Sequence, residues 1–263
     1  MTRKPSDGWS DYPDHFSSAD DADTYDELFR SDRCEQVCWE IQRALLHAVV
    51  AGFSSPAETK GHALDFACGT GRVTEVLYEA GLRTVGLDAS DSMVALAKRR
   101  MPAVEFRVGL LGTTETDQWL SALGSPFQLI TAFRFFLNTP ADQRAPILDL
   151  LVRQLHSQGR IIVNNHGSGP SLRNLGLKLR RNQDATILTQ REFVAMLDSA
   201  GLDVEQRWGG QIFTRKLYSS PIIRHVTCAI ERLLPRTAIG RALARAVGAQ
   251  QTYLCQMASR HYA

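Results

Sequence analysis

The chain has 263 residues, of which 44% are hydrophobic and 22% are charged. This composition is ordinary for a globular protein and excludes a disordered or collagen-like chain, and the length suits one large domain or one domain with a small appendage. Thirty basic side chains against 28 acidic ones give a formal net charge of +2, a balance that does not favour nucleic acid as a partner.

The sequence carries no sign of a membrane or secretory segment. No hydrophobic stretch reaches the roughly 20 residues that span a bilayer, and residues 1–26 are polar and acidic. We therefore expect a cytoplasmic protein. The cysteines are odd in number and scattered in spacing, so we expect reduced, mostly buried thiols and no metal site: Cys34, Cys38, Cys68, Cys228 and Cys255.

From residue 62 onward, short hydrophobic segments alternate with segments of helical periodicity. The expected strands are 62–66, 83–88, 104–108, 127–133, 160–165, 204–208 and 251–257. The expected helices are 71–80, 90–100, 114–123, 139–156 and 189–201; the fourth begins at Thr139-Pro140 and the fifth at a capping box, Thr189 to Glu192. This alternation predicts an α/β fold of the Rossmann-like, doubly wound kind, with a mostly parallel seven-stranded sheet.

The turn after the first strand is the most informative stretch, residues 64–72 (LDFACGTGR). Gly69 and Gly71 let the backbone bend sharply and approach a ligand. In a dinucleotide fingerprint a third glycine would stand at Thr74, and Asp65 would place a carboxylate near the pyrophosphate. S-adenosylmethionine has no phosphate and carries a sulfonium and an ammonium group, so Asp65 is favourable beside it. The turn therefore favours S-adenosylmethionine over NAD(P).

Asp88 ends the second strand, 19 residues after Gly69. A carboxylate at this position can accept hydrogen bonds from both hydroxyls of a ribose. NAD and S-adenosylmethionine both contain a ribose, so Asp88 alone does not distinguish them. Ala89 is small enough for an adenine to lie flat beside the chain, and Met93 would form an apolar cover over it.

Together these motifs resemble the core of the class I S-adenosylmethionine-dependent methyltransferases. The resemblance covers residues 62–165 through ALDFACGTGR, VGLDASDSM and FQLITAFRFFLN. It implies S-adenosylmethionine as cofactor, with contacts to the methionine moiety, the ribose, the adenine and the sulfonium in chain order: Asp65 and Ala67 at the methionine, Gly69 and Gly71 beneath the cofactor, Asp88 at the ribose, Gly109, Leu110 and Leu111 at the adenine, and Ala132 and Phe133 at the sulfonium.

Two positions depart from the pattern of that family. Ala67 replaces a common glycine, a change that the turn should tolerate. Leu110 stands where many members carry an acidic residue that binds the adenine amine. Backbone contacts would have to bind the adenine at that position instead.

The resemblance also implies an N-terminal helical lid, because the family commonly places one before the first strand. Tyr25 either packs on the methionine end of the cofactor or serves in helix packing. We expect a lid and helix over residues 1–58, a cofactor-binding core over 59–220, a helical insertion over 221–248, and a final strand with the C-terminus over 249–263.

Methyl transfer from a sulfonium is a displacement that depends mainly on alignment, and an oxygen nucleophile often also needs a general base. His166 follows the fifth strand and is our candidate base, with a pKa of about 6.5 when unperturbed; the alternative is a polar turn. Asn164 and Asn165 would orient it or the substrate. Arg134 and Asn138 are further substrate-binding candidates, with a salt bridge or a helix cap as their structural alternatives.

The sequence thus predicts a methyltransferase that acts on a small or lipid-linked acceptor, on oxygen rather than nitrogen. Two rivals stay open. One is a protein that binds S-adenosylmethionine without turnover. The other is an NAD(P)-dependent oxidoreductase, against which Asp65 and Thr74 argue.

The expected insertion, residues 221–248, is basic and amphipathic. Hydrophobic residues fall largely on one helical face and arginines accompany them. We expect this face to pack on the sheet; it could instead lie on an anionic membrane surface or cap a substrate pocket. Aromatic residues are not interleaved with the arginines, so we expect no nucleic-acid partner. The sequence does not indicate the oligomeric state.

Overall fold

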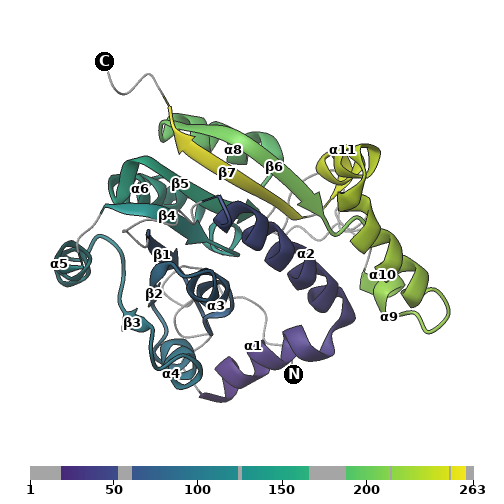
Figure 1. Ribbon diagram of the computed structural model, residues 1–263, viewed down its shortest axis with the longest axis horizontal. Coiled ribbons are helices and arrows are strands. Elements are labelled where there is room, and N and C mark those ends of the chain that lie inside the picture. Colours follow the sequence, from purple (N-terminus) through teal and green to yellow (C-terminus); the bar gives the residue numbers. More distant parts are fainter. Residues whose placement is uncertain are drawn as a thin grey trace.

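The computed structural model describes residues 19–52, 61–123, 126–165, 188–213, 215–248 and 250–258. Within these residues, seven strands form one sheet in the order β3-β2-β1-β4-β5-β7-β6 (Figure 1). Strands β1 to β5 pair in parallel, and β7 runs antiparallel to both β5 and β6. The predicted fold class is therefore confirmed. The strands are β1 (His62–Phe66), β2 (Arg83–Asp88), β3 (Glu105–Val108), β4 (Phe127–Ala132), β5 (Leu155–Asn165), β6 (Leu202–Gly210) and β7 (Gln250–Met257).

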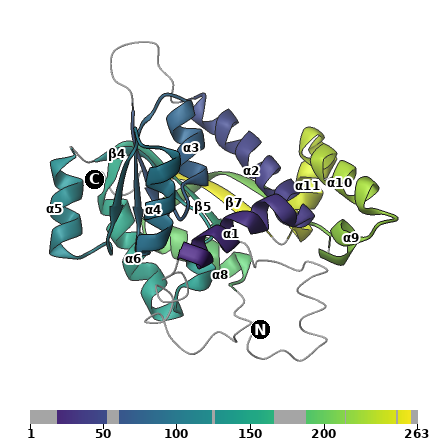
Figure 2. The same cartoon turned by 90° about the horizontal axis from the view of Figure 1, so that it is seen from below.

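Helices cover both faces of the sheet (Figure 2). One hydrophobic core joins the strands to α5 (Thr114–Ala122), α6 (Ala141–Arg153) and α8 (Gln190–Ser199). On the other face lie α2 (Arg33–Val50), α3 (Arg72–Glu79) and α4 (Asp91–Arg100). The remaining elements are α1 (Ala19–Ser31), η3 (Phe136–Asn138), α9 (Arg215–Ser219), α10 (Arg224–Leu233), η4 (Leu234–Arg236) and α11 (Ala238–Val247).

Local capping explains where several helices begin. The hydroxyl of Ser90 accepts a hydrogen bond from the amide of Met93 at the start of α4. At α8, Thr189 and Glu192 form the predicted capping box, in which each side chain accepts from the other residue's amide. Such caps satisfy amide groups that have no partner within the helix.

Two predicted boundaries were wrong by several residues. We expected the fourth helix over 139–156, but α6 begins after the cap residue Pro140 and ends at Arg153. The hydroxyl of Thr139 donates instead to the carbonyl of Phe135. Strand β5 begins at Leu155, five residues earlier than expected, because Leu155 pairs with Phe127 across the sheet. Pairing with a neighbouring strand thus ended the helix.

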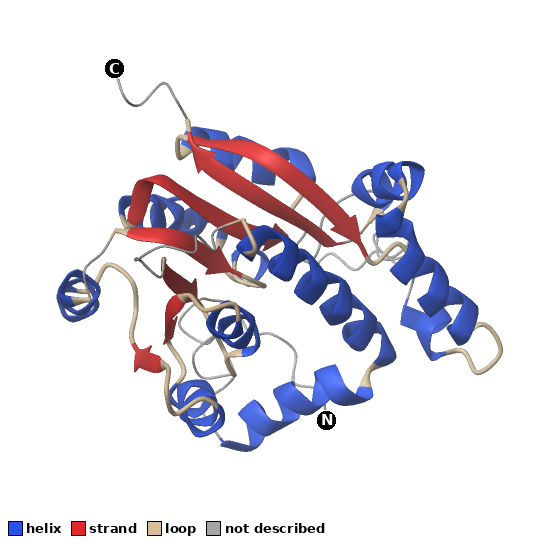
Figure 3. Cartoon of the chain, viewed as in Figure 1, coloured by secondary structure: helices blue, strands red, loops and turns tan. Residues whose placement is uncertain are grey.

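The basic insertion does not pack as expected. It forms α10 and α11, joined by η4, and the hydrophobic faces of both helices point to solvent. Ile222 is 86% exposed and Ile239 is 84% exposed. The expectation that this hydrophobic face covers the sheet is therefore wrong. Figure 3 shows these helices beyond the end of the sheet, with only α11 close to β6.

The five cysteines match the expectation of reduced, buried thiols. All five cysteines are free thiols and all are buried, as predicted. In the part of the chain that the structure describes, no helix combines the length and the hydrophobicity that crossing a membrane requires.

Candidate cofactor site

The turn between β1 and α3 takes a backbone form that few side chains tolerate. Ala67, Gly69 and Gly71 have φ angles of +54°, +55° and +85°. A Cβ atom on Gly71 would lie 2.5 Å from the methyl carbon of Met101, so that flexible side chain would have to move, and the positive φ would strain any side chain at this position. A Cβ atom on Gly69 would meet no protein atom within 4 Å. The left-handed conformation at Ala67 costs about 1–2 kcal/mol, a cost that glycine does not carry, and this is the consequence of the departure from the family pattern.

Asp88 joins this turn to the end of β2. Its Oδ2 accepts a hydrogen bond from the amide of Gly69 at 2.7 Å, and its Oδ1 accepts one from the amide of Ser90 at 2.9 Å. Burial raises the pKa of Asp88, and its hydrogen bonds from the backbone oppose that rise. Each oxygen retains a lone pair, so a fixed carboxylate presents two acceptors to the cavity that it lines.

Asp65 is placed differently from the prediction. Its side chain is only 1% exposed and does not line the cavity. Thr74 donates to Oδ2 at 2.6 Å and Thr131 donates to Oδ1 at 2.7 Å. Burial raises the pKa of Asp65 to about 6, although the two threonine hydroxyls oppose that rise. Asp65 therefore ties β1 to α3 and β4, and its predicted contact with the methionine moiety stays a prediction.

A cavity of about 300 Å³ opens at the carboxyl ends of β1, β2 and β4, the edge at which sheets of this kind bind ligands. Its walls are mostly hydrophobic, a feature of small-molecule sites. The predicted cofactor residues that line it are Tyr25, Ala67, Gly69, Asp88, Ala89, Met93, Gly109, Leu110, Leu111 and Phe133. Gly71 and Ala132 do not line it, because Gly71 packs against α4 and Ala132 is buried within β4.

Of the predicted substrate residues, Arg134 lines the cavity, and Asn138 and Asn164 fix the backbone of Arg134. Arg134 lines the cavity and has a φ of +58°. Its amide donates to Oδ1 of Asn164 at 2.5 Å, and its carbonyl accepts from Nδ2 of Asn138 at 2.7 Å. Because both bonds are made to its backbone, Asn138 and Asn164 fix the strained conformation of Arg134.

Asn165 and His166, the other two residues predicted to act on the substrate, are not among the described residues that line the cavity. Asn165 is fully buried, does not line the cavity, and donates from Nδ2 to the carbonyl of Leu188. The candidate base His166 lies outside the described residues. Its role stays a prediction.

Two arginines and aromatic rings connect the N-terminal helices to the cavity. The Arg72 guanidinium carbon lies 3.1 Å from the ring centroid of Phe29, and its Nη2 donates to the hydroxyl of Tyr25 at 3.4 Å. Arg134 stacks on the same ring at 4.7 Å and forms an ion pair with Glu35. Nη1 of Arg72 is buried and lacks a hydrogen-bond partner among the described residues. Desolvation lowers the pKa of Arg72.

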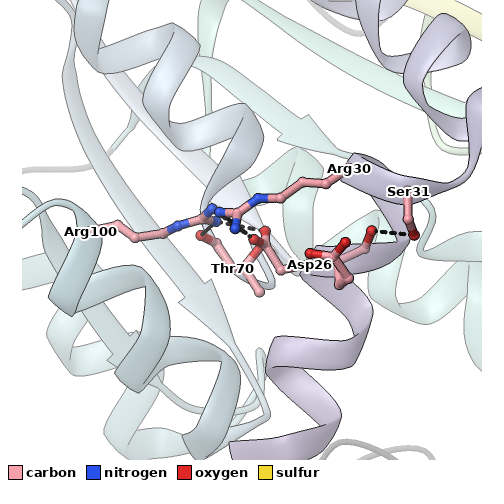
Figure 4. A network of polar contacts seen from close by, with 6 residues as sticks. Asp26, Arg30, Ser31, Thr70 and Arg100 are labelled. Carbon is pink, nitrogen blue, oxygen red and sulfur yellow. Dashed lines mark hydrogen bonds and ion pairs between the residues drawn. The ribbon is translucent and has the colours of Figure 1, made fainter.

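An ion-pair network fastens helix α1 to the core (Figure 4). The Asp26 carboxylate accepts from both terminal nitrogens of Arg100 on α4, at 2.7 and 2.8 Å. Arg30 lies 2.9 Å from the same carboxylate, and the Thr70 hydroxyl donates to it at 3.3 Å. Asp26 thus holds α1, and with it Tyr25, against the turn that follows β1.

The residues around the cavity fit S-adenosylmethionine. Asp88 presents two acceptors for ribose hydroxyls, and Gly69 leaves open space where any side chain would project. Arg72 does not itself line the cavity, but its Nη2 donates to the hydroxyl of Tyr25, which does. Among the described residues that line the cavity, Asp88 is the only acidic one, and Leu110, at the predicted adenine position, is 45% exposed. The predicted binding contacts of the cofactor themselves stay predictions.

Comparison with known proteins supports this interpretation. Residues 63–159 match the methyltransferase domain family. The chain also superimposes on magnesium protoporphyrin IX methyltransferase from Synechocystis with bound SAH, with a TM-score of 0.63, 14% identity, and coverage of 96% of this chain and 100% of that one. This chain contains a class I S-adenosylmethionine-dependent methyltransferase domain. The predicted family and the predicted cofactor, S-adenosylmethionine, are confirmed.

Two further relatives place the methyltransferase domain among proteins of varied function. A TehB-like methyltransferase from Corynebacterium glutamicum has a TM-score of 0.54 and 16% identity, with 91% of this chain and 100% of that one covered. A dTDP-4-amino-2,3,4,6-tetradeoxy-D-glucose N,N-dimethyltransferase from Saccharopolyspora spinosa is 34% identical over 84 residues. That match spans 31% of this chain and 31% of the relative, so it covers about a third of the curated relative's length.

Sequence reasoning missed two sets of contacts that hold helix α1 beside the cavity. It did not assign Arg72, which directly follows the glycine turn and contacts Tyr25 and Phe29 of α1. It also missed Asp26 and Arg100, which are 74 residues apart. Nothing in the sequence pairs two such distant charges, because charged residues at helical spacing usually lie on a solvated surface.

Proposed function

We propose that this protein transfers the methyl group of S-adenosylmethionine to an oxygen atom of a small or lipid-linked acceptor. The observation that carries the proposal is the cavity between the fixed carboxylate of Asp88 and the aromatic walls Phe133 and Phe135. The cofactor supplies an electrophilic methyl group, and the chain supplies alignment and exclusion of water. Hydrophobic walls serve both purposes.

Arg134 is the residue that the acceptor would meet first beyond the cofactor. Its backbone is fixed on both sides by Asn138 and Asn164, and its charge is balanced by Glu35. A neutral acceptor therefore suits this wall better than a strongly cationic one. His166 follows β5 directly in sequence and is the proposed acceptor of the hydroxyl proton.

A nitrogen acceptor is the second candidate. The similarity to a sugar N,N-dimethyltransferase favours it. A neutral amine has its own lone pair, so transfer to nitrogen depends less on a general base than transfer to a hydroxyl. Replacement of His166 by alanine would then leave turnover nearly unchanged, whereas the oxygen proposal expects a loss on the order of 10²–10⁴.

The test uses S-adenosylmethionine with an isotope-labelled methyl carbon. The purified protein is incubated with aqueous and lipid fractions of a cell extract, and labelled products are isolated and placed on oxygen or nitrogen by NMR. The Asp88→Ala variant is the control, because a signal that persists in it comes from a contaminant. Tight cofactor binding without product in any fraction would instead support a protein that binds S-adenosylmethionine without turnover.

A further inference from the structure

The surface of α10 and α11 concentrates the exposed hydrophobic side chains of the molecule. Eleven large hydrophobic residues are exposed in the described part of the chain, and seven of them lie between residues 222 and 243. Exposed hydrophobic residues gathered in one segment in this way indicate an interaction site. The seven residues, which we call the α10–α11 surface, are Ile222, Ile223, Val226, Ile230, Leu233, Ile239 and Leu243.

Both helices turn their hydrophobic faces outward because other residues hold their inner faces. On α10, Thr227, Cys228 and Glu231 face the protein, and Glu231 is only 1% exposed. Its carboxylate accepts from the amide of Ile212 at 3.1 Å. Burial raises the pKa of Glu231. The inward face of α10 is thus the more polar one, which leaves the aliphatic face without a partner within the described residues.

Helix α11 packs through small residues. Gly240 and Ala244 are buried, and a Cβ atom on Gly240 would lie 2.2 Å from the carbonyl oxygen of Leu234. On the strand side, a Cβ atom on Gly209 of β6 would lie 1.9 Å from the carbonyl oxygen of Ala244. This close contact fixes α11 against β6, so Ile239 remains outside.

The exposed charges of residues 221–248 have one sign. Arg232 pairs with Glu40 of α2. The exposed arginines Arg224, Arg236, Arg241 and Arg245 have no acidic partner among the residues that the structure describes. Glu231 is the only acidic residue from 221 to 248, and it is buried. The exposed charges of this segment that lack a partner are therefore all basic.

We propose that the α10–α11 surface docks on an anionic lipid bilayer. Short amphipathic helices with aliphatic residues on one face and arginines beside it lie in the interface of such membranes. A protein partner fits less well, because the centre of a protein interface usually carries aromatic anchors, and the seven exposed residues are all aliphatic. The ion pair between Arg232 and Glu40 ties α10 to α2, and Figures 1 and 2 show α10 and α11 together at one end of the molecule.

The experiment is cosedimentation of the whole protein with phospholipid vesicles. One set is phosphatidylcholine alone, and the other contains one third phosphatidylglycerol. We expect binding to the anionic vesicles only, with binding that weakens as salt is added because screening shortens the range of the attraction. Equal binding to both vesicle types, or binding to neither, would overturn the proposal.

Two double variants separate the charge from the hydrophobic contribution. Arg236→Gln with Arg245→Gln is expected to weaken binding about thirtyfold, since each arginine near the surface contributes about 1 kcal/mol. Ile222→Ser with Ile239→Ser is expected to weaken it by about tenfold or more. Both isoleucines are almost fully exposed, so the fold should be unaffected, which thermal unfolding checks.

Two control variants carry single substitutions of exposed residues outside this surface. Arg99→Gln alters an exposed arginine on α4, and Tyr78→Ser alters an exposed ring on α3. Both are expected to bind vesicles like the unaltered protein. If the controls lose as much binding as the test variants, the proposal is refuted. It is also refuted if the protein sediments as a dimer that Ile222→Ser dissociates, because the surface then joins two copies of this chain.

Discussion

The buried carboxyl group of Asp65 should make the free energy of unfolding depend on pH. The structure places Asp65 inside the protein, between the hydroxyls of Thr74 and Thr131 at 2.6 and 2.7 Å. In the Asp65→Asn variant, the amide oxygen accepts from one hydroxyl and the amide nitrogen donates to the other. The variant therefore keeps both contacts but loses the titrating group.

The size of this change in the free energy of unfolding follows from the raised pKa of Asp65. Burial raises the pKa of Asp65 from the ordinary 3.8 to about 6. The unfolded chain therefore releases this proton near pH 4, and the folded protein keeps it up to about pH 6. The free energy of unfolding falls as the pH rises across that window, and about two pH units correspond to about 3 kcal/mol. Asp65→Asn lacks this fall, so its stability relative to the unaltered protein rises by about 3 kcal/mol between pH 4 and pH 7.

The assay is urea denaturation of both proteins at several values between pH 4 and pH 7. Two stability curves that stay parallel across this range would refute the reasoning that Asp65 titrates inside the core. Calorimetry with S-adenosylmethionine gives a second readout. Since Asp65 does not line the cavity, the Asn variant should lose far less cofactor affinity than Asp88→Asn. An equal loss would return Asp65 to the role that the sequence first suggested.

Three further substitutions test the site. Asp88→Ala removes two charge-assisted acceptors for the ribose, and we expect cofactor affinity to fall by a factor on the order of 10²–10⁴; unchanged affinity by calorimetry would disprove the ribose assignment. Asp26→Ala breaks the network that holds α1, and we expect cofactor binding to weaken about tenfold. Asp23 is an exposed residue on the same helix, so Asp23→Ala should leave cofactor binding unchanged. Equal cofactor affinities of the two variants would contradict a role for the Asp26 network in binding. Gly71→Ala introduces a methyl group beside Met101 at a φ of +85° and should lower the unfolding free energy by about 1–3 kcal/mol, which chemical denaturation measures; an unaltered midpoint would argue against this strain.

The sequence determined the order and type of the elements of the sheet and the edge at which the cavity lies. The alternation of hydrophobic periodicities along the chain depends on local chemistry, because a strand buried on both faces and an amphipathic helix each impose a repeat on their own residues. The glycine turn and Asp88 are likewise local features at two strand ends. Parallel strands then bring those ends to the same edge of the sheet, so their meeting at one cavity could be predicted.

The tertiary structure alone decided which neighbours each side chain found. Asp65 was expected beside a ligand, but Thr131, 66 residues later in the chain, occupies one of its oxygens. Asn164 was expected to contact a substrate and instead fixes the backbone of Arg134. The hydrophobic face of α10 was expected to be buried, but Glu231 on the opposite face found a buried amide at Ile212. Contacts between residues distant in sequence leave no periodic pattern, so which partner satisfies a buried polar group emerges only when the chain has folded.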